Sequence, residues 1–90
     1  MLKAETLDFI KDCARQYDVK AVRLFGSALD DESSARDIDL AVEGIDDKKF
    51  YDFYGRLFFG LSKPVDLVDL SEDLPIASLI RQRGTLIYER

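Results

Sequence analysis

The sequence predicts an α+β fold in which a mixed β-sheet of about four strands packs against helices in two layers. Short segments rich in β-forming residues alternate with longer segments whose apolar residues recur at helical spacing, in the order α-β-β-α-β-α-β. The 90 residues also have the composition of a globular protein, with 47% hydrophobic and 34% charged residues. We therefore expect a single domain over residues 1–90.

The first half of the chain predicts one helix and two strands. Residues Leu2–Tyr17 form the helix, and Val19–Phe25 is a short strand that ends at Gly26-Ser27. The polar stretch Ala28–Arg36 is a loop, with room for a turn of helix at its start. Asp37–Glu43 alternates with period two, which is typical of a half-buried strand. The apolar face of the helix carries Leu7, Ile10, Ala14 and Tyr17.

The second half begins with a helix and a third strand. Gly44 ends the preceding strand, and Asp46 or Asp47 is placed to cap the helix that follows. Lys63–Leu70 is the third strand. The helix between them has an apolar stripe formed by Phe50, Phe53, Tyr54, Leu57 and Phe58, which leaves Tyr51, Phe59 and Leu61 outside it.

The chain closes with a last helix and a last strand. Ser71, Glu72 and Asp73 lie where the helix would be capped, and Pro75 suits its first turn. Gly84 suits the position just after its end. Thr85–Tyr88 is the final strand.

Composition excludes several classes of function. The chain has no histidine, which removes His-based zinc sites and Ser-His-Asp hydrolysis. Its net charge of −5 argues against direct nucleic-acid binding, which needs basic surface. No apolar run is long enough to span a membrane, and the lone Cys13 cannot form an intramolecular disulfide, so we expect a cytoplasmic protein.

Two acidic residues are candidate ligands for a divalent cation. Asp37 and Asp39 are two residues apart on one predicted strand, so their side chains leave the same face with Cα atoms roughly 6.6 Å apart. Mg²⁺ prefers oxygen ligands and commonly takes one or two carboxylates together with phosphate oxygens. An isolated D-x-D motif more often consists of two solvated carboxylates. The surrounding sequence therefore decides whether Asp37 and Asp39 bind a cation.

That context is a Gly-Ser step at the end of the preceding strand. Gly26 permits close approach of the backbone, and Ser27 offers a hydroxyl to a phosphate oxygen. A helical turn starting at Ser27 would also direct free N–H groups at the same anion. By itself Gly-Ser is an ordinary tight turn. The combination of strand, Gly-Ser, acidic pair, strand, helix and a further acidic strand is the informative feature.

The pattern G-S-x₉-D-x-D, formed here by Gly26-Ser27 and Asp37-Ile38-Asp39, resembles the polymerase β-type nucleotidyltransferase superfamily. Within it the chain is similar to the minimal nucleotidyltransferases, from about Val19 to Tyr88. The resemblance implies a third carboxylate within the later strand. Asp66 and Asp69 are three residues apart and therefore face opposite sides of the sheet. The alternation of side chains along the strand does not show which of the two faces Asp37 and Asp39. The resemblance favours Asp66, which leaves Asp69 as a cap or a solvated residue.

The resemblance also implies a mechanism. Asp37, Asp39 and Asp66 would be the catalytic and metal-binding residues for two Mg²⁺ ions, with Asp66 able to accept a proton. Gly26 and Ser27 would hold the β- and γ-phosphates of ATP. Many relatives carry a cation soon after Gly-Ser, whereas this chain has the acidic triplet Asp30-Asp31-Glu32, which would repel a triphosphate unless it points away or is screened. Arg36, and then Arg23 or Lys63, are the candidate replacements.

Minimal nucleotidyltransferases are frequently antitoxins paired with a HEPN-type toxin. The resemblance implies transfer of AMP from ATP to a hydroxyl, with a tyrosine as the favoured acceptor, on such a toxin, by a homo- or hetero-oligomer. One alternative is a non-catalytic module that neutralises its partner by steric occlusion through surplus aromatic residues. A lower-ranked alternative is nucleotidylation of a small molecule.

Overall fold

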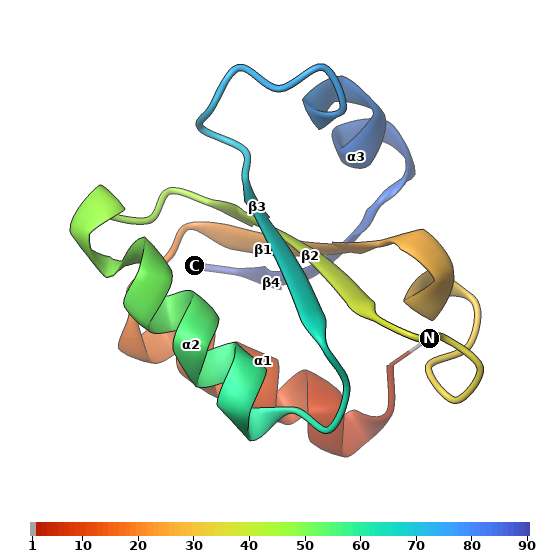
Figure 1. The fold of residues 1–90 in the computed structure, drawn as a ribbon. Coiled ribbons are helices and arrows are strands. Elements are labelled where there is room, and N and C mark those ends of the chain that lie inside the picture. Colours follow the sequence, from red (N-terminus) through yellow and green to blue (C-terminus); the bar gives the residue numbers. More distant parts are fainter. Residues whose placement is uncertain (1) are drawn as a thin grey trace.

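The computed structural model describes residues 2–90 and contains helices on both sides of a four-stranded sheet (Figure 1). The elements follow the predicted order, with two additional 3₁₀ turns. They are α1 (Ala4–Gln16), β1 (Ala21–Phe25), η1 (Gly26–Leu29), β2 (Ile38–Glu43), η2 (Asp47–Lys49), α2 (Phe50–Gly60), β3 (Val65–Asp69), α3 (Ala77–Arg83) and β4 (Thr85–Glu89).

The sheet is mixed, as predicted, with the strand order β3-β2-β1-β4. Strand β1 pairs antiparallel with β2 and with β4, whereas β2 and β3 run parallel. A parallel pair needs a crossover connection, and α2 provides it. As a result of this mixed arrangement, the end of β1 and the starts of β2 and β3 lie at the same end of the sheet.

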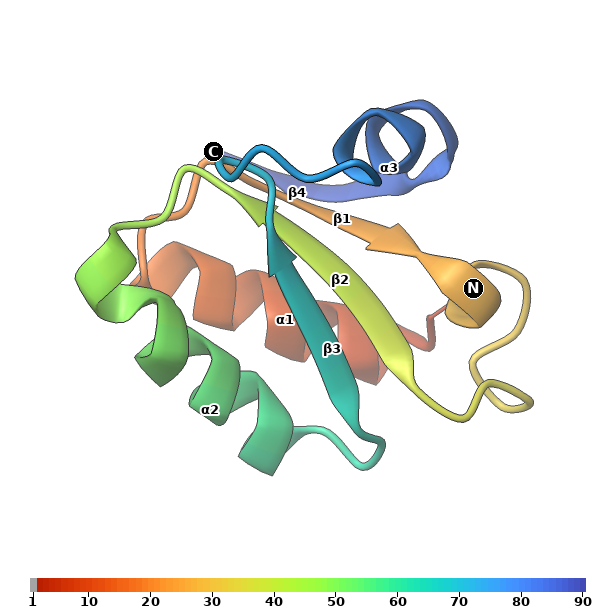
Figure 2. The same ribbon diagram turned by 45° about the horizontal axis from the view of Figure 1, so that its top comes forward.

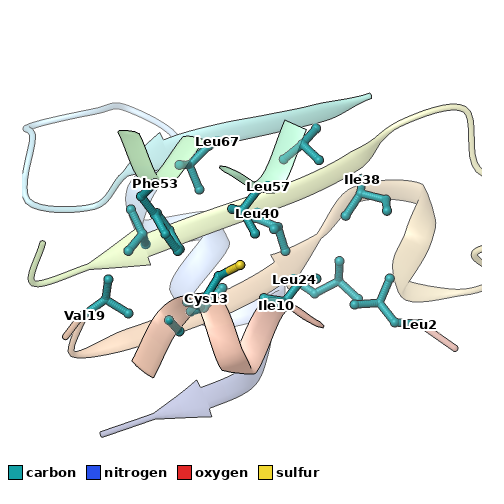
Figure 3. Close-up of a cluster of buried hydrophobic side chains, with 14 of the residues drawn as sticks. Leu2, Ile10, Cys13, Val19, Leu24, Ile38, Leu40, Phe53, Leu57 and Leu67 are labelled. Carbon is teal, nitrogen blue, oxygen red and sulfur yellow. The ribbon is translucent and has the colours of Figure 1, made fainter. Parts of the chain in front are cut away.

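The two faces of the sheet are covered unequally. Helices α1 and α2 lie together on one face and α3 lies on the other (Figure 2). The main core forms under α1 and α2, where Ile10, Leu24, Leu40, Phe53 and Leu57 are fully buried (Figure 3). Residues Ile38, Leu40 and Val42 all belong to this core, which confirms the predicted alternation of β2. A smaller cluster of Ala41, Leu70 and Ile80 lies under α3.

Helix α2 confirms most of its predicted stripe. The Asp46 carboxylate accepts a hydrogen bond from the backbone N–H of Lys48, so Asp46 caps η2 just before the helix. Phe53 and Leu57 are buried, and Phe50 and Tyr54 pack against the core. The prediction for Phe58 was wrong: it lies about 100° beyond Leu57 around the helix and is 50% exposed. Tyr51 and Phe59 are exposed as predicted, but Leu61 packs against the core.

The start of the last helix also differs from the prediction. Helix α3 begins at Ala77, and no side chain caps it, so Ser71, Glu72 and Asp73 are not its cap. These residues instead belong to the turn that follows β3. Gly84 directly follows α3, as predicted, and its backbone N–H donates to the carbonyl of Ile80. A Cβ at Gly84 would meet that carbonyl oxygen at 2.6 Å, so no larger residue fits.

The remaining differences are shifts of element ends. Helix α1 ends at Gln16, β1 starts at Ala21 rather than Val19, and β2 starts at Ile38 rather than Asp37. No helix within residues 2–90 is both long and apolar enough to cross a membrane.

Candidate active site

Strand register brings the predicted acidic residues together at one end of the sheet. Asp39 on β2 lies opposite Phe25 on β1 and opposite Asp66 on β3. Neighbouring strands are about 4.8 Å apart, and residues in register point to the same face, so the Asp39 and Asp66 side chains are lateral neighbours. That face is the one covered by α3. The pairing supplies the positional information that side-chain parity lacks.

The choice between Asp66 and Asp69 follows from the same register. Asp66 is exposed beside Asp39, whereas Asp69 is on the opposite face and only 6% exposed. The Asp69 carboxylate accepts hydrogen bonds from the backbone N–H of Ser71 at 2.9 Å and from its hydroxyl at 2.8 Å. Asp69 therefore caps the turn after β3, as predicted, but it is not solvated.

Asp37 completes the acidic group from just before β2, where it is exposed. Asp39 is half-buried between the other two. Burial, followed by the charges of Asp66 and Asp37, raises the pKa of the Asp39 carboxyl above its ordinary value. Because both neighbours act on the same carboxyl, the three residues form one electrostatically coupled cluster, which we call the acidic cluster.

The donor set of the acidic cluster fits a magnesium site. Among residues 2–90, no three acidic or cysteine side chains are already drawn together as ligands of one ion. Mg²⁺ usually keeps only one or two protein carboxylates and takes further oxygens from phosphates and water. The carboxylates of the acidic cluster repel one another and supply oxygen ligands, so they suit that requirement. We therefore propose Asp37, Asp39 and Asp66 as the ligands, which keeps the expectation from the sequence as a proposal.

Gly26 lies directly against the acidic cluster. It opens η1 with a φ of +75°, a conformation that glycine adopts without strain. A Cβ atom at Gly26 would lie 3.0 Å from Cγ of Asp39 and closer still to its Oδ2. Gly26 and Ser27 are both exposed, so a backbone N–H and a hydroxyl are available beside the carboxylates. This geometry suits an anion that shares a metal with Asp39.

The loop after η1 turns part of its acidic triplet away from the site. Glu32 is 5% exposed, and its carboxylate accepts hydrogen bonds from the backbone N–H of Lys3 at 2.7 Å and from the Thr6 hydroxyl at 3.0 Å. Glu32 therefore accepts hydrogen bonds from donors at the start of α1, where backbone N–H groups have no partner within the helix. This role was not predicted from the sequence, because the contact joins residues 29 and 26 positions apart.

The three candidate cations have different surroundings. The Lys63 ammonium donates to the backbone carbonyls of Glu32 and Ala35 and so holds the same loop. Arg23 forms an ion pair with Glu43 at 2.9 Å. Arg36, next to Asp37, is exposed and forms no ion pair with any residue in the described range. Of the three, only Arg36 is available to a ligand.

Comparison with known proteins agrees with this geometry. The family model described as "Polymerase beta, Nucleotidyltransferase" matches residues 8–90, which include every residue of the candidate site. Comparison with curated protein sequences found no match.

Solved structures with a similar fold include chains from toxin–antitoxin complexes. A chain of the MntA-HepT complex is 21% identical, with a TM-score of 0.74, over 98% of this chain and 74% of that one. A toxin–antitoxin structure with AMP-PNP contains a chain that is 24% identical, with a TM-score of 0.75, over 93% of this chain and 73% of that one. A chain in a complex of tri-AMPylated Shewanella oneidensis HEPN toxin with MNT antitoxin is 22% identical, with a TM-score of 0.75, over 99% of this chain and 74% of that one. At these identities the likeness establishes a shared fold.

Proposed function

Because the chain belongs to the polymerase beta nucleotidyltransferase family, we propose that it transfers AMP from ATP to a hydroxyl group on a partner protein. The observation that carries this proposal is the placement of Asp39 in register with Asp66 and against Gly26. The fold neighbours are complexes of MNT antitoxin with HEPN toxin, one of them AMPylated, which favours a HEPN-type toxin as the partner. The chain would then act as an antitoxin in the cytoplasm.

The proposed reaction is an in-line displacement at the α-phosphorus of ATP. The partner hydroxyl oxygen forms a bond to phosphorus, the bond to the bridging oxygen breaks, and pyrophosphate leaves with the electron pair. Asp66, the exposed carboxylate beside Asp39, accepts the proton from the hydroxyl. A tyrosine is the favoured acceptor by family resemblance.

The other residues of the site bind and position the triphosphate. The Gly26 N–H and the Ser27 hydroxyl donate to phosphate oxygens, and Arg36 adds a cation beside Asp37. Asp37, Asp39 and Asp66 would hold two Mg²⁺ ions, which would neutralise phosphate charge and lower the pKa of the attacking hydroxyl. Positioning and charge neutralisation carry most of the rate enhancement in such reactions.

A second candidate function is neutralisation of the partner by binding alone. Helix α2 exposes Tyr51 by 80% and Phe59 by 88%, beside a groove of about 620 Å³ between α1 and α2. Exposed aromatic side chains of this kind favour a protein interface. This surface is on the opposite face of the sheet from the acidic cluster, so binding and transfer can be separated by mutation.

The two functions are distinguished by toxin neutralisation with a variant in which Asp37, Asp39 and Asp66 are all replaced by asparagine. For an adenylyltransferase, this variant still binds the partner but no longer inhibits its ribonuclease activity in the presence of ATP and Mg²⁺. Neutralisation that persists in the variant would establish steric occlusion instead. A Tyr51→Ser, Phe59→Ser variant is the matched test of the aromatic surface, with loss of partner binding as its readout.

A further inference from the structure

An apolar pocket lies beside the acidic cluster, between η1 and α3. Its volume is about 310 Å³. Leu79 is 46% exposed and Ile76 is 44% exposed, so α3 presents apolar surface to solvent here. Gly26, which lies against Asp39, is part of the pocket wall, so the pocket and the acidic cluster adjoin. The wall includes Phe25, Gly26, Leu29, Ile76, Leu79 and Arg83.

The chemistry of the wall fits a flat, uncharged ring system attached to an anion. Phe25 contributes an aromatic side chain, and the other side chains except Arg83 are apolar or absent. Arg83 is exposed and has no ion-pair partner within residues 2–90. An unpaired guanidinium at the rim of an apolar pocket suits a ligand that carries phosphate.

We infer that this pocket binds the base of the nucleoside triphosphate and that Arg83 contacts its phosphates. The inference rests on the proposed function, which places the phosphates at Gly26 and Ser27. A nucleotide held there has its base within reach of the adjoining pocket. Contact of a base with aromatic and aliphatic side chains commonly contributes to nucleotide affinity.

The composition of the wall also defines the class of substrate. No side chain that lines the pocket can accept a hydrogen bond. Since we assign the Arg83 guanidinium to the phosphates, the remaining side chains of the wall recognise the base by its face and shape rather than by its polar edge. Since apolar pockets discriminate weakly between ligands of similar shape, GTP binds within about tenfold of ATP.

Calorimetry with Mg²⁺ tests the inference, with ATP and inorganic tripolyphosphate as probes. The variant Ile76→Ser, Leu79→Ser removes two exposed apolar side chains and introduces no charge. It lowers the affinity for ATP by about tenfold and leaves the affinity for tripolyphosphate unchanged. Arg83→Gln weakens the binding of both probes. The matched control is Phe58→Ser, which removes a half-exposed apolar side chain from α2 and changes neither affinity.

Far-UV circular dichroism shows separately that each variant is folded, because tripolyphosphate affinity is itself one of the readouts. Unchanged ATP affinity in the Ile76→Ser, Leu79→Ser variant, or equal losses for ATP and tripolyphosphate, would overturn the base pocket while the proposed function stands. A preference for ATP over GTP far above tenfold would overturn recognition by the face of the base. Failure of the unmodified protein to bind either probe would overturn the inference and the proposed function together.

Discussion

Gly26, directly after β1, lies so close to Asp39 on β2 that a Cβ atom at Gly26 would overlap the Oδ2 of that carboxylate. The contact couples the turn that we propose binds phosphate to the carboxylate that we propose binds metal. Any side chain at Gly26 would displace one group or the other.

Substitution of Gly26 by alanine tests this coupling. The substitution places a Cβ against Asp39 and imposes a positive φ on an alanine, so we expect AMP transfer to fall by at least about 100-fold, as for other misplaced catalytic groups. The matched control is Gly55→Ala on α2, where a Cβ meets nothing within 4 Å. Alanine there should leave transfer unchanged and stabilise the protein by up to about 1 kcal/mol. Comparable activity of the two variants would contradict the coupling.

Asp39→Asn should separate stability from activity. The pKa of Asp39 is raised by burial and by Asp66 and Asp37, so the folded state binds this proton more tightly than the unfolded state. Its contribution to stability is present below the ordinary pKa of 3.8 and is lost as pH rises through the higher folded value. At neutral pH without Mg²⁺, Asn should therefore raise the unfolding free energy by up to about 1 kcal/mol after solvent screening, and abolish transfer.

Thermal unfolding in a chelator at pH 7, with a parallel transfer assay, measures both effects. Asp69→Ala is the matched control on the opposite face of the sheet. It loses two hydrogen bonds to Ser71, so it should destabilise the protein by about 1–3 kcal/mol and retain transfer. A destabilised Asp39→Asn variant would show that the acidic cluster is not strained in the free protein.

Glu32→Ala tests the role of the buried carboxylate in the loop. Its loss leaves the N–H of Lys3 and the hydroxyl of Thr6 without their acceptor, so we expect a destabilisation of about 1–3 kcal/mol in urea unfolding. Glu72→Ala, which removes an exposed glutamate, should change stability by less than about 0.5 kcal/mol. Equal effects would mean that Glu32 does not anchor α1 in solution.

Glu43 predicts a dependence of stability on acid. Its pKa is lowered by hydrogen bonds from Arg23 and Arg81, and Lys20 adds a further ion pair at 3.7 Å. The resulting stability is present above the ordinary pKa of 4.5 and is lost as pH falls through the lower folded value. Glu43→Gln should lower the free energy of unfolding by about 1 kcal/mol at pH 7. It should also make the free energy of unfolding less dependent on pH under acidic conditions. If the pH dependence in acid is unchanged in this variant, other carboxylates are responsible for it.

Periodicity in the sequence predicted the elements of the fold, because each amphipathic segment has a single way to bury its apolar face. Strand order and register were not predicted, because they depend on contacts between distant segments. The choice between Asp66 and Asp69 illustrates the difference. Parity leaves both acids open, and only the parallel pairing of β3 with β2 places Asp66 beside Asp39.

The wrong predictions came from local spacing, which does not show how distant segments pack. Phe58 matches the helical stripe by spacing, but it lies to one side of the buried Phe53 and Leu57 around the helix and is 50% exposed. Ser71 resembles a helix cap because it follows a strand and precedes a helix, and its actual partner is Asp69. Arg83 was not singled out by the sequence, because its place on a pocket wall depends on how α3 packs.

The most direct test of the proposed activity is transfer of label from ATP to the proposed partner toxin, with ATP labelled at either the α- or the γ-phosphate. We predict that the α-label becomes covalently attached to the toxin in the presence of Mg²⁺, that the γ-label does not, and that Asp37→Asn combined with Asp39→Asn abolishes attachment. Folded protein that transfers no α-label, or variants that transfer it undiminished, would contradict the assignment of the acidic cluster as a nucleotidyltransferase site.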